Sequence, residues 1–165
     1  MFALLAFAAA AGLSPQQLDI ATRVAGPGKP ACTSTLPDGA SAPCLPLFQA
    51  GAGARVDGVR LGATITFTRG ALHRLTPAEF ALLAGHEIAH YYLGHQHSDP
   101  ASELAADRLG ARYACAAGYD PAAGLSLFRF LEAGTTHPPR AAREAAVRTV
   151  RAECWGGTGQ GASPS

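Results

Sequence analysis

Two hydrophobic patterns stand out along the chain, one with the period of a helix and one with that of a strand. Apolar side chains recur every three or four residues in the middle of the chain and form one stripe of a helix: Phe80, Ala84, Ile88 and Tyr91. Polar and apolar residues alternate over residues 64–68, where β-branched and aromatic side chains favour a strand. We expect residues 56–61 to pair with that strand. In the stretch rich in glycine and proline before them, residues 44–48 are the only candidate strand.

Helix starts are marked by a capping residue followed directly by proline. The capping side chain accepts a hydrogen bond from a free backbone N–H, and proline at the first helical position loses no hydrogen bond. The pattern occurs four times: Ser14-Pro15, Thr76-Pro77, Asp99-Pro100 and Asp120-Pro121. Three glycines mark helix ends: Gly94, Gly118 and Gly134. These signals predict helices over residues 15–25, 77–94, 100–117, 121–132 and 139–153.

The chain has 165 residues, of which 48% are hydrophobic and 15% charged, and this fits one globular domain with its own core. The fold class that we expect is α+β, mainly helical with a small sheet beside the helix over residues 77–94. We assign this domain to residues 14–155. Residues 156–165 have nothing to bury, so we expect a disordered tail there.

Charge and the N-terminal segment bear on partners and location. The formal net charge is +1 without a long basic run, so nothing indicates nucleic acid as a partner. Residues 1–13 are apolar or small but too few to span a bilayer, and we expect no transmembrane span in the mature chain. We interpret them as a signal peptide that exports the protein to the periplasm or the medium. The alternative is a buried N-terminal helix in a cytoplasmic protein. No feature indicates an oligomeric state.

Four cysteines are present, at positions 32, 44, 115 and 154. None has the C-x-x-C spacing of a zinc ribbon or of a thioredoxin-type redox site. For an exported chain we expect disulfides between Cys32 and Cys44 and between Cys115 and Cys154. Four free thiols are the alternative in a cytoplasmic protein.

The helix over residues 77–94 carries His86-Glu87-Ile88-Ala89-His90. Histidines four apart project from one face of a helix about one turn apart, as two ligands of one metal ion require. In H-E-x-x-H peptidases the intervening glutamate is not a ligand; it takes a proton from the attacking water and passes it to the leaving amine. His86 and His90 are therefore candidate zinc ligands, and Glu87 is the candidate general base.

The next helix brings a second pair four residues apart, Glu103 and Asp107. Two histidines leave a catalytic zinc one protein ligand short, and Glu103 can supply it while water keeps the fourth position. Asp107, one turn on, can accept the outer N–H of a ligand histidine. The alternative for this pair is a solvated acidic face with Arg108 or Arg112 as partners.

Two further histidines, His95 and His97, are rival ligands. His95 is nine residues beyond His86, on the helix face about 180° away, and it follows Gly94 where the helix is expected to end. His97 falls in the turn before Asp99. We expect neither to bind the metal, which leaves one zinc ion per chain on His86, His90 and Glu103.

Several segments of the chain, in the same order, resemble segments of the gluzincin peptidases, the family that includes the CAAX prenyl endopeptidases and the HtpX-like bacterial proteases. They are the H-E-x-x-H run, Glu103-Leu104-Ala105-Ala106-Asp107-Arg108-Leu109-Gly110, Gly118-Tyr119-Asp120-Pro121 and Thr136-His137-Pro138. The segment from Thr64 to Leu75 is similar to the strand and turn before the zinc helix of that family. The resemblance covers about residues 55 to 145. It implies a zincin-like metalloprotease domain, with His137 near the substrate carbonyl and Arg143 as the family's arginine; Arg140 is the less favoured candidate for that arginine.

The function that we expect is zinc-dependent hydrolysis of peptide bonds in a protein or peptide substrate. Glu87 moves the proton and His137 stabilises the oxyanion. We expect the substrate to add to an edge strand formed by Thr64, Ile65, Thr66, Phe67 and Thr68.

Two other functions stay open. The segment from His86 to His95 also resembles the zinc helix of regulatory metalloproteases that cleave antirepressors. A binding or chaperone module that holds zinc without hydrolysis is the alternative outside the enzymes, although a purely structural site has no need of Glu87.

Overall fold

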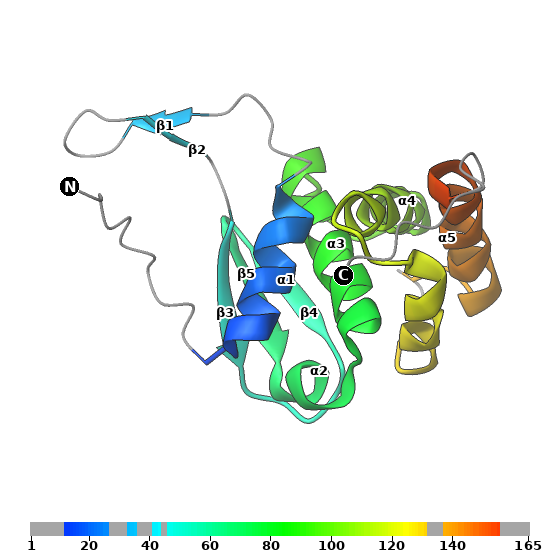
Figure 1. Ribbon diagram of the computed structural model, residues 1–165, viewed down its shortest axis with the longest axis horizontal. Helices are drawn as coiled ribbons and strands as arrows, with labels where there is room; N and C mark the ends of the chain where they lie inside the picture. Colours follow the sequence, from blue (N-terminus) through cyan, green and yellow to red (C-terminus); the bar gives the residue numbers. More distant parts are fainter. Residues whose placement is uncertain (1–11, 27–32, 36–40, 44–45, 132–136, 156–165) are drawn as a thin grey trace, which may run out of the picture.

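The computed structural model of the protein describes residues 12–26, 33–35, 41–43, 46–131 and 137–155 (Figure 1). Its helices are α1 (Pro15–Ala25), α2 (Arg69–Arg74), α3 (Pro77–Leu93), α4 (Pro100–Ala116), the 3₁₀ helix η1 (Pro121–Arg129) and α5 (Arg140–Trp155). Its strands are β1 (Thr33–Thr35), β2 (Ser41–Pro43), β3 (Leu47–Gly51), β4 (Gly58–Leu61) and β5 (Thr64–Thr68). Helices with a small sheet were expected, and this coarse class is confirmed.

The helices begin where the pairs of capping residue and proline place them. Ser14 and Thr76 each accept a hydrogen bond from the backbone N–H three residues on, in full capping boxes at the starts of α1 and α3. Asp99 caps α4 through two backbone N–H groups. Gly94 ends α3 in the left-handed conformation, at φ 67°, which an amino acid with a side chain rarely adopts.

One predicted helix has a different form. Residues 121–132 were expected to be α-helical, but η1 is a 3₁₀ helix that stops at Arg129. It packs against α3 so closely that a Cβ atom on Gly124 would lie 2.7 Å from the carbonyl oxygen of Ala78. Tertiary packing therefore decides the geometry of this segment. Gly134, the expected helix end, lies outside the described residues.

The larger sheet has the strand order β3-β5-β4. β4 pairs with β5, as expected; the pairing is antiparallel, with Leu61 opposite Thr64. β3 begins later than the candidate strand at 44–48 and pairs in parallel with β5, with Phe48 opposite Ile65. The prediction that residues 64–68 form an edge strand is wrong, because β5 lies in the middle of this sheet and β4 is the edge next to α3.

Three elements were not expected from the sequence: α2 and the small antiparallel pair of β1 and β2. α2 is only six residues long and contains a glycine, so neither length nor propensity marks it. Thr68 at the end of β5 caps it by accepting a hydrogen bond from the backbone N–H of Ala71.

The core lies between the sheet and the helices. Ile65 and Phe67 of β5 are fully buried, and the ring of Phe67 meets Phe80 of α3 edge to face, with 4.8 Å between the centroids. α3 is the central helix of the fold. The sheet and α1 lie on one side of it, and α4, η1 and α5 lie towards the other (Figure 1).

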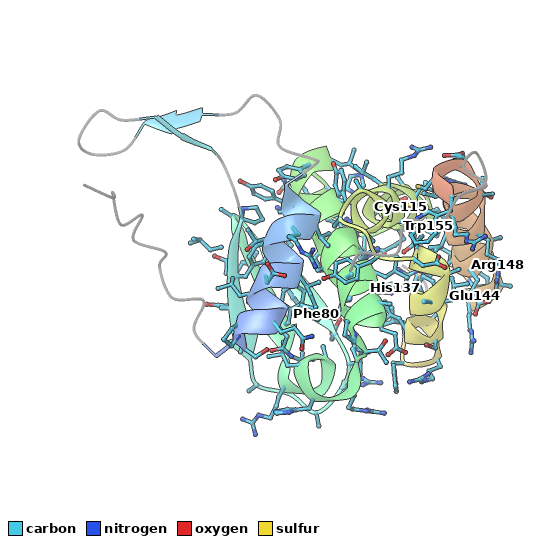
Figure 2. All side chains as sticks on the ribbon, viewed as in Figure 1. Phe80, Cys115, His137, Glu144, Arg148 and Trp155 are labelled. Atoms are coloured by element: carbon cyan, nitrogen blue, oxygen red, sulfur yellow. The ribbon has the colours of Figure 1, made fainter. Side chains whose placement is uncertain are left out.

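The expectations about a membrane span and about disulfide bonds can be compared with the described residues only. No helix among the described residues is both long and apolar enough to cross a bilayer. Cys115 of α4 and Cys154 of α5 are free thiols whose side chains hydrogen-bond to each other, with Trp155 alongside (Figure 2). The expected disulfide bond between these two cysteines therefore stays a prediction. Cys32, Cys44, most of the expected signal peptide and the expected tail lie outside the described residues.

Candidate metal centre

Two turns of α3 bring the H-E-x-x-H side chains to one cavity. His86, Glu87 and His90 are all buried, which is unusual for ionisable groups without partners. α3 is fixed by its apolar stripe, since Phe80, Ala84 and Ile88 are buried in the core. The backbone that carries the histidines is therefore held from the opposite side of the helix.

Glu103 from α4 completes a cluster with the two histidines. His86 Nε2 lies 3.0 Å from His90 Nε2 and 3.3 Å from Glu103 Oε2, and His90 Nε2 lies 3.4 Å from Glu103 Oε1. Ligand atoms about 2.0–2.2 Å from a tetrahedral zinc ion lie roughly 3.3 Å apart, so these spacings fit such an ion. His86, His90 and Glu103 could therefore hold a metal ion.

The carboxylate of Glu103 gives a second test of this fit. Its Oε1 accepts a hydrogen bond of 2.8 Å from the hydroxyl of Ser98, while its buried Oε2 has no hydrogen-bond partner in the described part of the chain. A buried carboxylate oxygen without a donor is costly, and a cation between the three side chains would remove that cost. The chemistry of the donor set thus agrees with its geometry.

Asp107 supports the ring of His86 from behind. Its Oδ1 lies 2.9 Å from His86 Nδ1, so the ring donates its outer hydrogen there and turns the lone pair of Nε2 towards the cluster. Arg143 of α5 in turn donates two hydrogen bonds of 2.7 Å to Asp107, from Nε to Oδ2 and from Nη2 to Oδ1. The Arg143 guanidinium also lies over the ring of Phe128, which fixes it from the other side. Asp107 is buried, so a solvated acidic face is excluded for it.

The pKa values of these groups reflect the crowding of charge. Burial alone lowers the pKa of His86, but the carboxylates of Asp107 and Glu103 outweigh it and raise the pKa to about 9. Burial alone raises the pKa of Glu103, but its contacts with His86 and His90 outweigh that and hold the pKa well below its usual range. The carboxylate is thus ionised at neutral pH, as a metal ligand must be.

Glu87 lies beside the cluster without joining it. Glu87 is 7% exposed as a residue and lines the same cavity, and burial raises the pKa of its carboxyl above the ordinary value. β4 passes directly over it, since a Cβ atom on Gly58 would lie 2.8 Å from Glu87 Cγ. A base needs access to a reacting group rather than to the metal, and this position provides it.

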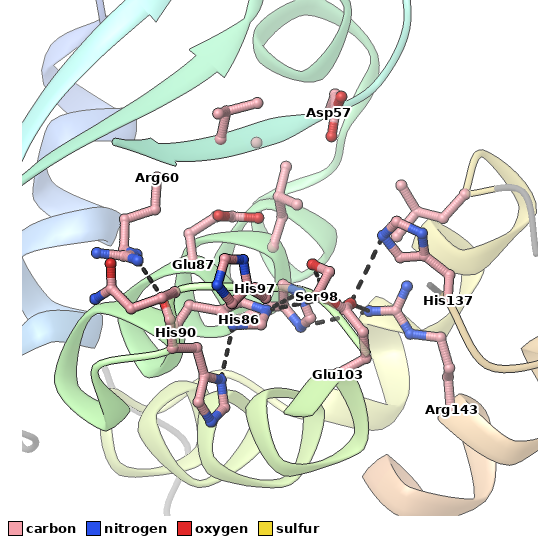
Figure 3. Close-up of a pocket in the computed structure, with 16 residues that line it drawn as sticks. Asp57, Arg60, His86, Glu87, His90, His97, Ser98, Glu103, His137 and Arg143 are labelled. Carbon is pink, nitrogen blue, oxygen red and sulfur yellow. Dashed lines mark hydrogen bonds and ion pairs between the residues drawn. The ribbon is translucent and has the colours of Figure 1, made fainter. Parts of the chain in front are cut away.

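His137 and Arg143 approach the cluster from the side opposite to Arg60 (Figure 3). His137 Nε2 lies 3.7 Å from Glu103 Oε2, and its side chain stays 43% exposed, so it can meet a molecule in the cavity. Arg143 contacts Asp107 behind His86 and also lines the cavity. Arg140 lies on the surface and pairs with Glu144, outside the site.

The position of His95 corrects the sequence-based expectation. Its ring was expected on the far side of the helix, but its Nδ1 lies 2.9 Å from Nδ1 of His90. The left-handed turn at Gly94 reverses the chain directly after α3 and brings His95 back to the last helical turn. His97 lines the cavity, and its imidazole makes no hydrogen bond within the described residues.

The cavity in front of the cluster has a volume of about 310 Å³ (Figure 3). Its walls include residues that the sequence did not single out, namely Asp57, Gly58, Val59, Arg60 and Ser98. They come from β4, from the residue directly before it and from the turn before α4, so only the packing of those segments on α3 reveals them. The residues of β5 do not line this cavity.

Comparison with protein-family models, with curated proteins and with solved structures gave no match to this chain. The assignment of a function therefore depends on the geometry of the site.

Proposed function

We propose that this chain is a zinc-dependent endopeptidase with a zincin-like domain of the gluzincin type. The observation that carries the proposal is that the cavity holds a set of possible metal ligands and, separately, a buried carboxyl group. Three buried side chains converge as a ligand set, and a fourth buried carboxyl, that of Glu87, lies beside them without being a ligand. A structural metal site closes its fourth position and needs no such group, so this arrangement favours hydrolysis over a zinc-holding binding module.

Zinc at this site would supply a Lewis acid that polarises the scissile carbonyl and lowers the pKa of the attacking water. The side chains of the protein supply the remaining functions. Glu87 accepts the proton of the attacking water and delivers it to the leaving amine. His137, exposed at the rim, donates a hydrogen bond to the oxygen that becomes negative.

The edge strand β4 is the place where a peptide substrate would bind. β4 pairs only with β5 in the described sheet, so its other edge presents backbone groups that an extended peptide can pair with. Residues from Asp57 to Arg60 line the cavity that holds Glu87 and the ligand set. A peptide added to this edge would therefore pass in front of the metal ligands, a role that we had expected of β5.

The test is metal content and peptide hydrolysis of the purified chain, with and without a chelator. We expect bound zinc, turnover of an unfolded protein such as casein, and loss of turnover on chelation that added zinc reverses. Glu87→Gln keeps its zinc but loses activity by about 10²–10⁴-fold, because the amide cannot accept a proton. Glu103→Ala loses the metal itself.

Glu153→Gln serves as the matched control, because Glu153 is half-exposed on α5, pairs with Arg112 and does not line the cavity. Its zinc content and activity should equal those of the unmodified chain. Zinc binding without any hydrolysis would leave a binding module as the function. Loss of zinc in Glu87→Gln would show that Glu87 is a ligand and would contradict the proposal.

A further inference from the structure

The two ligand histidines are supported in different ways. His86 has the carboxylate of Asp107 behind its outer nitrogen, at 2.9 Å. Among the described residues, no carboxylate takes the equivalent place behind His90; its outer nitrogen faces Nδ1 of His95, also at 2.9 Å. The two imidazoles meet edge to face, with 5.0 Å between their centroids. The spacing of Asp107 from Glu103 already predicts its place behind a ligand histidine, whereas the proposed function assigns no role to His95.

The direction of the hydrogen bond follows from the ligand geometry. Nε2 of His90 points to Nε2 of His86 and to Oε1 of Glu103, so this nitrogen must keep its lone pair for a metal. The hydrogen of a neutral His90 ring is then on Nδ1. His95 Nδ1 has to accept it, and the hydrogen of the His95 ring is on Nε2.

Two backbone contacts hold His95 in this place. Its own N–H donates to the carbonyl oxygen of His90, at 3.1 Å, so the turn after α3 is closed onto the residue that His95 supports. The guanidinium of Arg60, on β4, donates to the carbonyl oxygen of His95 (Figure 3). Arg60 also donates to the carbonyl oxygen of Gly62, which fixes its own direction. The backbone of His95 is thus hydrogen-bonded both to α3 and to the edge strand β4.

We propose that His95 is a positioning residue for the metal ligand His90: it accepts the Nδ1 hydrogen of His90 and so fixes the tautomer and the orientation of that ring, while Arg60 holds the turn that carries His95. The proposal rests on the metal-binding part of the proposed function and not on peptide hydrolysis. Partners of this kind contribute about 10–100-fold to metal affinity in other metal sites.

The experiment is a zinc titration of the full chain against a competing chelator, which measures affinity without any substrate. We expect His95→Ala to weaken zinc binding by about 10–100-fold. His95→Asn should restore most of the affinity, because its Oδ1 can occupy the place of Nδ1 and accept the same hydrogen bond. Arg60→Met removes the hydrogen bonds to the carbonyl oxygens of His95 and Gly62 but leaves the contact between the rings of His90 and His95 in place, so a smaller loss is expected than in His95→Ala.

His73→Ala is the matched control, since it removes an exposed imidazole on α2 that does not line the cavity. Its zinc affinity should equal that of the unmodified chain. Circular dichroism of the metal-free variants checks that each is folded. Equal affinities for His95→Ala and the unmodified chain would overturn the proposal. So would an equal loss in His95→Ala and His95→Asn, because an orientation role requires rescue by the acceptor.

These outcomes are separable from the fate of the proposed function. A chain that binds zinc and hydrolyses peptides, with His95→Ala unchanged in affinity, would remove the role of His95 and leave the peptidase. A chain that shows the expected loss and rescue but no hydrolysis would keep the role of His95 and remove the peptidase. A chain that takes up no zinc would overturn both.

Discussion

Gly85 and Gly110 touch backbone to backbone where α3 crosses α4. A Cβ atom on Gly85 would lie 2.4 Å from the carbonyl oxygen of Gly110, and one on Gly110 would lie 2.5 Å from the carbonyl carbon of Gly85. Gly85 directly precedes His86, and Gly110 follows Asp107 by about one turn. The absence of both side chains lets the helices approach closely enough for the carboxylates of α4 to reach the histidines of α3.

The first prediction concerns this crossing. Gly110→Ala pushes the helices apart, because rigid backbone rather than a flexible side chain blocks the added methyl group. We expect a loss of about 1–3 kcal/mol in the free energy of unfolding, as for overpacked cores, together with weaker zinc binding. Chemical denaturation of the metal-free protein and a zinc titration measure the two effects. Arg108→Ala, at an exposed site on the same helix, should change neither. Full zinc affinity in Gly110→Ala would show that the crossing does not set the ligand geometry.

The second prediction concerns the contact between β4 and the base. In Gly58→Ala the new methyl group meets Glu87 at its Cγ and Oε1 atoms, which can move because the side chain is flexible. We expect zinc affinity to stay and kcat to fall by about 10²-fold, the effect of misplacing a reacting group by about an ångström. Steady-state kinetics with a fluorogenic peptide measure it. Glu153→Gln, on α5 and outside the cavity, is the control and should keep its kcat. An unchanged kcat would show that the added methyl group does not displace the carboxyl of Glu87, and it would contradict the prediction.

The third prediction concerns the rim residue His137. His137→Ala should keep its zinc and its fold but lose about 10²–10³-fold in kcat/KM, because one donor to the developing oxyanion is gone. His73→Ala provides the matched control, since His73 is an exposed histidine on α2, away from the cavity. Equal catalytic efficiency of His137→Ala and the unmodified chain would remove His137 from the site.

The fourth prediction concerns pH. In the metal-free protein His86 has its pKa raised to about 9, above the ordinary 6.5, so its proton stabilises the fold. That contribution is complete below about pH 6.5 and is lost as the pH rises through about 9. The Tm of the metal-free protein should therefore fall over this window. Zinc competes with the same proton, so its affinity should rise with pH over the window, with about one proton released per ion at pH 7.5.

Titration calorimetry in buffers of different ionisation enthalpy measures this release. Asp107→Asn is the informative variant, because it removes the main group that raises the pKa of His86. Its proton release at pH 7.5 should be smaller. Zinc uptake without proton release in the unmodified chain would contradict the prediction.

The features that sequence reasoning predicted correctly depend on neighbours along the chain. The starts of α1, α3 and α4 follow from a capping side chain and the N–H groups within three residues of it. The spacing of His86 and His90 needs only a helix, and the pairing of β4 with β5 needs only a tight turn. Local rules are sufficient in each of these cases.

The features that it missed depend on contacts between distant segments. β5 is central because β3 pairs with it in parallel from an earlier part of the chain, and no local pattern encodes that. η1 takes its form from packing on α3. For His95, the helix rule was applied past Gly94, where the left-handed turn makes it invalid. Gly58 has no chemical group to notice, and its importance follows only from its place over Glu87.

The three side chains that could hold a metal ion lie on α3 and α4, and their partners Asp107 and His95 belong to the same helical hairpin. The residues that hold these partners come from outside it: Arg143 of α5 contacts Asp107, and Arg60 of β4 contacts His95. Contacts within a hairpin close a short loop and cost little chain entropy, so they form quickly in a folding chain. The ligand set can therefore assemble before the sheet edge and the last helix dock. Formation of the α3–α4 hairpin with its three candidate ligands, followed by packing of β4 and α5 around it, is the order of events that these sequence separations favour.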